Sequence, residues 1–152
     1  MRTIEVTICS SVRPTERVEK VVSAIENIFP GLIMDIRADK IEAYNGPDSL
    51  KTLHELLRRQ EILDTARKVM LRTLVGNTTA FLLSKQAALM GLVSFPPEEE
   101  ALGSLHVQIT GGEGVINWLA PETVNGVPVR EIDQSELGEG GLEEGEQGGA
   151  GV

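Results

Sequence analysis

Apolar residues recur along the chain with two different periods, and the switches between these periods constrain the fold more than any other feature. Residues 3–10 alternate between apolar and polar side chains, as in a strand that buries one face. Residues 18–29 instead place six apolar side chains at helical spacing, and Pro30–Gly31 ends that pattern. We therefore predict a strand followed by a helix. Thr15 is the predicted N-cap of this helix, because its hydroxyl group can accept a hydrogen bond from the first turn.

Further strands are predicted where the alternation returns or where a β-prone run lies between turn residues. These segments are residues 32–36, 41–44, 78–83, 92–95 and 105–109. The glycine-rich segment 110–114 follows the last of them and lacks the lysine of a phosphate-binding loop, so it is predicted to be a hairpin turn. The apolar run after it, residues 115–119, is ambiguous between strand and helix.

A long helical pattern runs from about residue 48 to residue 74. Gln60 stands where its apolar stripe requires an apolar side chain, so two helices that meet near Arg59 and Gln60 are an alternative to a single helix. A short helix is predicted over Lys85–Met90, with Ser84 as its cap. The order of elements predicts an α+β fold in which a mostly antiparallel sheet is backed by helices.

Periodicity disappears near the end of the chain, after Val129. Residues 131–152 are rich in Gly and Glu and hold seven acidic residues but no basic residue. Such a segment cannot bury enough apolar surface to offset its chain entropy. We predict a single domain over residues 1–130 and a disordered acidic tail over residues 131–152.

The sequence predicts neither a membrane protein nor a metal or cofactor site. No run of about 18 apolar residues is present, as a transmembrane helix would require. The single Cys9 cannot form an internal disulfide bond, which favours a reducing, cytoplasmic environment. His54 and His106 lie far from each other and from Cys9, without metal-ligand spacing. No acid, base or nucleophile spacing is found either, so we expect no cofactor and no enzymatic activity.

Charge is distributed unevenly. The whole chain carries a net charge of −9, whereas the stretch from Lys51 to Lys85 has seven basic and three acidic residues. This basic strip is compatible with a phosphate-facing surface, a solvated helix face or a subunit contact. Its candidate RNA-binding or interface residues are Arg58, Arg59, Asp64, Arg67, Lys68, Lys85 and Gln86.

Five short segments, in this order along the chain, resemble an archaeal family of uncharacterised proteins that is often labelled RNA-binding. The segments are Pro14–Glu16, Leu57–Arg67, Lys85–Ala88, Gly91–Phe95 and Leu102–Gly103. No single segment is decisive, but together they are specific, and the resemblance covers about residues 1–130. This sequence has Ser84 where the family tends to have Asn, and either residue can cap a helix.

The resemblance implies a fold similar to that of the large-subunit ribosomal protein that binds 5S ribosomal RNA, and it implies a homodimer. In some archaea a similar module is joined to a P-loop kinase-like domain. Four of the candidate residues match the family motif, namely Asp64, Arg67, Lys85 and Gln86. The match leaves open whether they serve the fold, the dimer or a ligand.

Two functions stay open at this point. The first is a dimeric, non-enzymatic scaffold or adaptor with a protein partner, which the acidic net charge favours. The alternative is a module that binds structured RNA through the basic strip. Aromatic residues make up only 3% of the chain, so any RNA binding is expected to be mainly electrostatic rather than to depend on base stacking.

Overall fold

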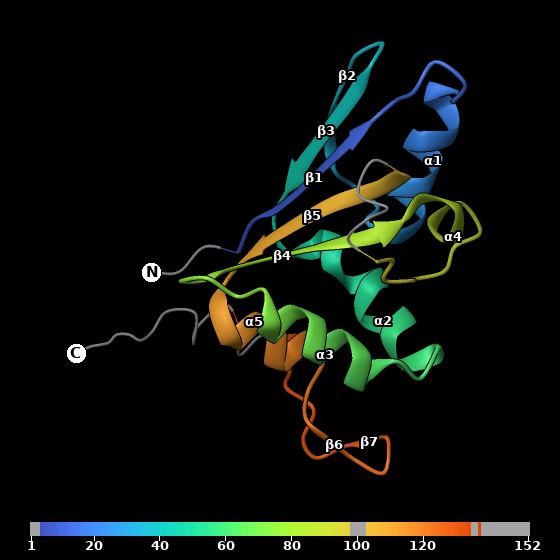
Figure 1. The fold of residues 1–152 in the computed structure, drawn as a ribbon. Helices are drawn as coiled ribbons and strands as arrows, with labels where there is room; N and C mark the ends of the chain where they lie inside the picture. The colour runs from blue at the N-terminus through green and yellow to red at the C-terminus, as the bar shows by residue number, and fades with distance from the viewer. Residues whose placement is uncertain (1–3, 98–102, 135–136, 138–152) are drawn as a thin grey trace, which may run out of the picture.

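The computed structural model describes residues 4–97, 103–134 and 137, and its framework is a five-stranded sheet (Figure 1). The strands of this sheet are β1 (Val6–Ser11), β2 (Ile33–Ile36), β3 (Lys40–Asn45), β4 (Thr78–Ser84) and β5 (Ser104–Thr110). They lie in the order β2-β3-β1-β5-β4, and every neighbouring pair is antiparallel. Together with the helices, this sheet confirms the predicted α+β class.

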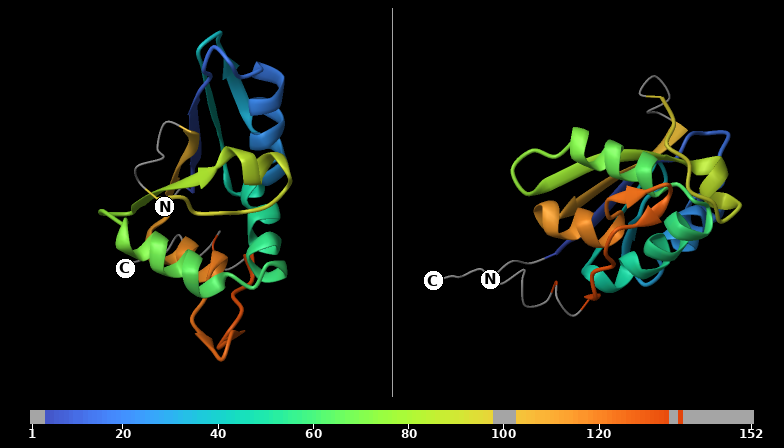
Figure 2. Two further views of the ribbon diagram at one scale, coloured as in Figure 1. Left: turned by 45° about the vertical axis from the view of Figure 1, so that its right-hand side comes forward. Right: turned by 90° about the horizontal axis from the view of Figure 1, so that it is seen from below.

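Helices cover one face of the sheet. They are α1 (Val18–Ile28), the short 3₁₀ helix η1 (Pro47–Leu50), α2 (Lys51–Arg59), α3 (Leu63–Arg72), α4 (Lys85–Leu89) and α5 (Gly112–Leu119). Figure 2 shows α1 and α2 along this face, with α3 and α5 at the end of the molecule away from the β2–β3 hairpin. A second hairpin, made of β6 (Thr123–Val124) and β7 (Val127–Pro128), projects from that end.

The alternation in the sequence determines which face of the sheet is buried. In β1, Val6 and Ile8 are fully buried while Thr7 between them is exposed. In β5, Val107 is buried and its neighbour Gln108 is exposed. Successive side chains of a strand point to opposite faces, so one face of the sheet belongs to the hydrophobic core. We call the opposite face, which the described helices leave uncovered, the outer face.

The long helical pattern is divided into α2 and α3, in agreement with the two-helix alternative. The break follows Gln60, and Glu61 adopts a positive φ of 58°. The side chain of Gln60 bonds to the backbone of Val93, 33 residues further on. This contact explains why a polar residue occupies the apolar stripe at the junction. The predicted cap of α4 is also confirmed, since Ser84 Oγ accepts a hydrogen bond from the Ala87 N–H at 3.2 Å.

Two local predictions were wrong. Thr15 is not the N-cap of α1, because that position belongs to Arg17, which makes no side-chain capping bond. Residues 92–95 form an irregular segment instead of a strand. Leu92 N–H donates to Ala87 O, Val93 bonds to the Gln60 side chain, and Ser94 O accepts from the N–H of Ser84 at the end of β4. Its backbone is therefore satisfied without a place in the sheet.

The predicted hairpin turn over residues 110–114 was also wrong, because this glycine-rich segment begins helix α5. Gly111 and Gly112 adopt positive φ values of 131° and 67°, and their N–H groups both donate to the Asn77 carbonyl oxygen at 2.9 Å. A Cβ atom on Gly111 would lie 3.1 Å from the Val115 side chain. The two glycines thus let the chain turn sharply from β5 into a buried helix.

The predicted acidic tail lies mostly outside the described residues, and its disorder stays a prediction. The described residues at its start contact the domain. Glu131 pairs with Arg58, Ile132 packs against the core, and Leu137 is buried in the core. Among the residues that the structure describes, no helix combines the length and the apolar composition needed to cross a membrane.

Candidate functional site

Arg58, at the end of α2, is surrounded by acceptors from three parts of the chain. Its Nη1 donates to the carbonyl oxygens of His54, at 2.8 Å, and Leu119, at 2.9 Å. Its Nη2 donates to Trp118 O at 3.2 Å. Its Nε and Nη2 donate to the two carboxylate oxygens of Glu131, at 2.9 and 2.7 Å. The guanidinium therefore satisfies carbonyls at the C-terminus of α5 and holds the segment that follows β7.

The surroundings of Arg58 shift two pKa values. Hydrogen bonds from Arg58 lower the pKa of Glu131, although partial burial acts in the opposite direction. Burial lowers the pKa of His54, and the adjacent positive charge of Arg58 lowers it further. The His54 ring stacks on Trp118 with 4.6 Å between the ring centroids. A neutral imidazole and an ionised carboxylate are thus the favoured states around Arg58.

Arg67 and Asp64, on α3, bind residues in the last turn of α5 and just beyond its end. Arg67 Nη1 donates to Asn117 Oδ1 at 2.9 Å and to Ala120 O at 3.0 Å. The Thr123 hydroxyl group donates to Asp64 Oδ1. Asp64 and Arg67 therefore bind separate partners instead of forming the i,i+3 ion pair that their spacing allows. Together with Arg58, they hold α5 and the β6–β7 hairpin against α2 and α3.

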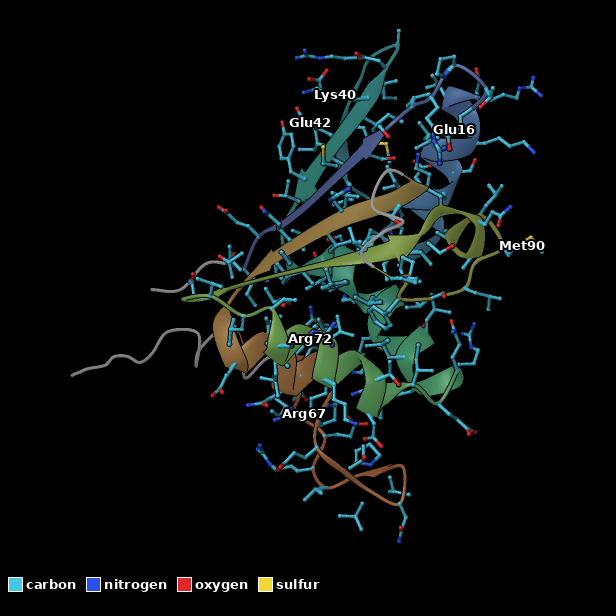
Figure 3. All side chains as sticks on the ribbon, in the orientation of Figure 1. Glu16, Lys40, Glu42, Arg67, Arg72 and Met90 are labelled. Atoms are coloured by element: carbon cyan, nitrogen blue, oxygen red, sulfur yellow. The ribbon has the colours of Figure 1, made fainter. Side chains whose placement is uncertain are left out.

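Lys85, the first residue of α4, is buried and lies outside the cluster around Arg58 and Arg67. Its Nζ donates to Ser11 O at 2.7 Å and to the two carboxylate oxygens of Glu16 at 3.0 and 3.1 Å. Partial burial raises the pKa of Glu16, but the Arg13 N–H and the Lys85 ammonium lower it more, so the net shift is downward. Figure 3 shows Glu16 beside α1, where this ion pair joins β1, α1 and α4.

The remaining candidate residues are exposed. Arg59, Lys68 and Gln86 make no side-chain hydrogen bond or ion pair with the described residues. The structure therefore divides the seven predicted residues into two groups. Arg58, Asp64, Arg67 and Lys85 hold elements of the fold together, whereas the other three are available to a partner.

Two surfaces were missed when the sequence was considered alone. One is the apolar patch formed by Ile33 and Tyr44, cross-strand neighbours on the outer face at the β2–β3 end of the sheet, where each side chain is about half exposed. The other is a groove of about 490 Å³ between α3 and the β4 edge of the sheet, which Arg72 helps to line. Neither has a sequence motif, because the patch depends on the register that places Ile33 beside Tyr44 and the groove depends on the packing of α3 beside β4. In the described part of the chain, no group of three or more His, Cys, Asp or Glu side chains is arranged to hold a metal ion.

Comparisons with known proteins show consistent similarities. A family model described as RNA binding matches residues 5–110. A UPF0201 protein of Saccharolobus solfataricus is 38% identical over 136 aligned residues, which cover 83% of this chain and 93% of that protein. A UPF0200/UPF0201 protein of Archaeoglobus fulgidus is 36% identical, with 88% of this chain covering only 42% of that protein. These matches confirm the resemblance to an archaeal family labelled RNA-binding.

A solved structure agrees with the sequence comparisons. The crystal structure of a UPF0201 protein from Methanococcus jannaschii superposes with a TM-score of 0.76 and 36% sequence identity, over 83% of this chain and 99% of that chain. The similarity therefore extends over the described sheet and its helices, and it is not restricted to the short segments that carried the resemblance. The implied likeness to the 5S-rRNA-binding ribosomal protein stays a prediction.

Proposed function

The chain belongs to the archaeal UPF0201 family, and we propose that it is a non-enzymatic scaffold or adaptor that works as a homodimer. The observation that carries this proposal is the apolar patch at the β2–β3 end of the sheet. Ile33 is 54% exposed and Tyr44 is 52% exposed, and the two are direct cross-strand neighbours. Large apolar side chains that gather on an open sheet are typical of an interaction surface.

Charge at this patch suits a second copy of the same chain. Arg37 pairs with Asp35 at 3.2 Å, and Lys40 pairs with Glu42 at 3.5 Å. Both signs therefore occur around the apolar side chains, which allows this surface to be complementary to itself in an isologous two-fold interface. β2 is also an edge strand with few residues, and a partner that covers it would remove an edge open to aggregation.

The proposal that the protein is not an enzyme is supported by cationic side chains that are hydrogen-bonded within their own chain. Arg58, Arg67 and Lys85 donate to backbone carbonyl oxygens and to side chains of their own chain. A second surface is available for an adaptor role. The β6–β7 hairpin projects from the body and exposes Val124 and Val127. A dimer would present two such hairpins to a protein partner.

Light scattering at micromolar concentration tests the dimer. We expect twice the chain mass of 16.4 kDa for the wild type and the monomer mass for Tyr44→Glu. Val75→Glu is the matched control, because Val75 is exposed but lies outside the patch. A monomeric wild type would overturn the proposal, and a dimer that tolerates Tyr44→Glu would place the interface elsewhere. For the adaptor role, Val127→Glu should lose a partner that the wild type captures from an archaeal extract.

RNA binding is the second candidate, favoured by the description of the matching family model and by three exposed cations without internal partners. These are Arg59, Lys68 and Arg72. Structured RNA should be titrated at low and at physiological salt. Loss of binding in Arg59→Gln with Lys68→Gln would support this candidate. Arg58→Ala is unsuitable as a probe, because its removal would disturb α5. If the wild type binds no RNA even at low salt, the candidate fails.

A further inference from the structure

The groove beside β4 has the size of a small-molecule site. It measures about 490 Å³ and lies where α3 passes the edge of the sheet. Ligand sites in proteins commonly fall between about 300 and 1,000 Å³. β4 and β2 are opposite edges of the sheet, so this groove is separate from the apolar patch that we propose as the dimer interface.

One face of α3 forms the first wall. Thr65, Val69, Arg72 and Thr73 recur at helical spacing, so they share this face and line the groove together. Arg72 makes no hydrogen bond or ion pair with the described residues, in contrast to Arg58 and Arg67. Figure 3 shows Arg72 on α3, below β4 in that view. Its guanidinium is therefore available to a ligand.

The second wall combines polar and apolar groups. His106 and Gln108 lie on the exposed side of β5, and Ala80 of β4 is the cross-strand partner of Gln108. The small alanine leaves the amide of Gln108 uncovered. The Phe95 ring meets Phe81 edge-on, with centroids 5.8 Å apart and an interplanar angle of 61°. Phe95 thus adds an aromatic surface to the lining of the same groove.

The charge of the lining favours an anion. None of the described residues that line this groove is an Asp or a Glu. Three other cavities between described residues include carboxylates, such as Glu16 between α1 and α4 and Glu122 beside Arg67. In a chain with a net charge of −9, a groove with an unpaired arginine and no lining carboxylate is electrostatically distinct.

We propose that this groove binds a small organic anion with a flat, aromatic body, the chemistry of a nucleoside monophosphate. The anionic group binds Arg72, the planar body packs on Phe95, and Gln108 bonds to its polar edge. A single lining arginine matches one phosphate group. The exposed carboxylate of Glu5, beside the end of β5, would repel a continuing nucleic-acid strand. A free small molecule is therefore the favoured occupant.

Calorimetric titration of the full chain with AMP, GMP, CMP and UMP tests the proposal, with inorganic phosphate as the probe for the anionic group alone. We expect saturable binding of at least one nucleotide, and weaker binding of inorganic phosphate, which lacks the planar body. Arg72→Gln should weaken nucleotide binding about tenfold or more, because it removes a charge-assisted hydrogen bond. Lys20→Gln removes an exposed cation of α1, outside the groove, and should leave binding unchanged.

Three results would overturn the proposal. The first is that the folded wild type binds none of the four nucleotides at concentrations up to about 1 mM. The second is an equal loss of nucleotide binding in Arg72→Gln and Lys20→Gln, which would indicate non-specific attraction. The third is that a single-stranded oligonucleotide binds more tightly than the corresponding monophosphate and that this binding depends on Arg72. The occupant would then be a nucleic-acid strand. Light scattering measures the mass of the dimer independently of nucleotide binding. The dimer proposal and the groove proposal can therefore fail separately.

Discussion

Gln60 and Val93 are joined by two hydrogen bonds between a side chain and a backbone. Gln60 Nε2 donates to Val93 O at 2.9 Å, and Val93 N–H donates to Gln60 Oε1 at 2.8 Å. Val93 is buried, and its segment belongs to no strand. The amide of Gln60 therefore supplies the donor and the acceptor that a neighbouring strand would otherwise supply.

Replacing this amide is predicted to destabilise the fold even though its position lies in an apolar stripe. Gln60→Leu would leave the N–H and C=O groups of Val93 without these partners, at a cost of about 1–3 kcal/mol in the free energy of unfolding. Chemical denaturation measures the loss. Gln86→Leu is the control, because Gln86 is exposed and makes no such bonds. A Gln60→Leu variant as stable as the wild type would show that the two bonds are dispensable.

Arg58 and Arg59 are adjacent, but their replacement should have very different effects. Arg58→Ala removes the donors that satisfy the carbonyl oxygens of Trp118 and Leu119 and leaves Glu131 without its cation. We expect it to lower the free energy of unfolding by about 2–3 kcal/mol. Arg59→Ala, at an exposed position without internal bonds, should change it by no more than about 0.5 kcal/mol. Equal effects in denaturant unfolding would contradict the structural role of Arg58.

The sequence was most informative where the determining contacts are local. Alternation identified β1 and β5, and Ser84 was identified as a helix cap because its partner, Ala87, lies three residues away. The helix α5 was missed for a different reason. Val115, Ile116, Trp118 and Leu119 are all buried, so the segment lacks the polar face that makes a helix visible in a sequence.

The candidate site was harder to predict, because its residues use distant partners. Glu131 is 73 positions from Arg58, and Asn117 is 50 positions from Arg67. The sequence around a cation on a polar helix face does not indicate such a partner. The sequence alone therefore predicted more cations free to bind RNA or a partner than the structure shows. Arg72, which has no internal partner, was not among the predicted site residues. The groove that it lines exists only once α3 and β4 are packed together.

His54 should make stability depend on pH around neutrality. Burial and the charge of Arg58 lower its pKa in the folded protein below the ordinary value of 6.5. The unfolded chain therefore binds a proton more readily as the pH falls below about 6.5, and folding stability decreases. His54→Phe keeps a ring opposite Trp118 but cannot titrate. The fall in melting temperature between about pH 7 and pH 5 should be smaller in this variant, and an unchanged fall would assign it to other groups.

The ion pair between Lys85 and Glu16 predicts an asymmetric double-mutant cycle. The Lys85 side chain is 9% exposed and that of Glu16 is 25% exposed, so the ammonium depends more on its partner than the carboxylate does. Glu16→Gln leaves a buried cation without its counter-charge, because the amide and Ser11 O are neutral acceptors. It should cost more than Lys85→Met, whose orphaned carboxylate keeps the Arg13 N–H and access to water. The double variant should recover part of the loss, with a coupling energy of about 1–2 kcal/mol.

The same pair provides a test with acid. The pKa of Glu16 is lower in the folded protein than its ordinary value of 4.5. Its contribution to stability is therefore present above about pH 4.5 and is lost as the pH falls through the folded-state pKa. Lys85→Met removes the ammonium that lowers this pKa, so the variant should lose less stability than the wild type when the pH falls from about 5 to about 3. Parallel pH profiles combined with a zero coupling energy would mean that the contact between Lys85 and Glu16 makes no net contribution to the fold.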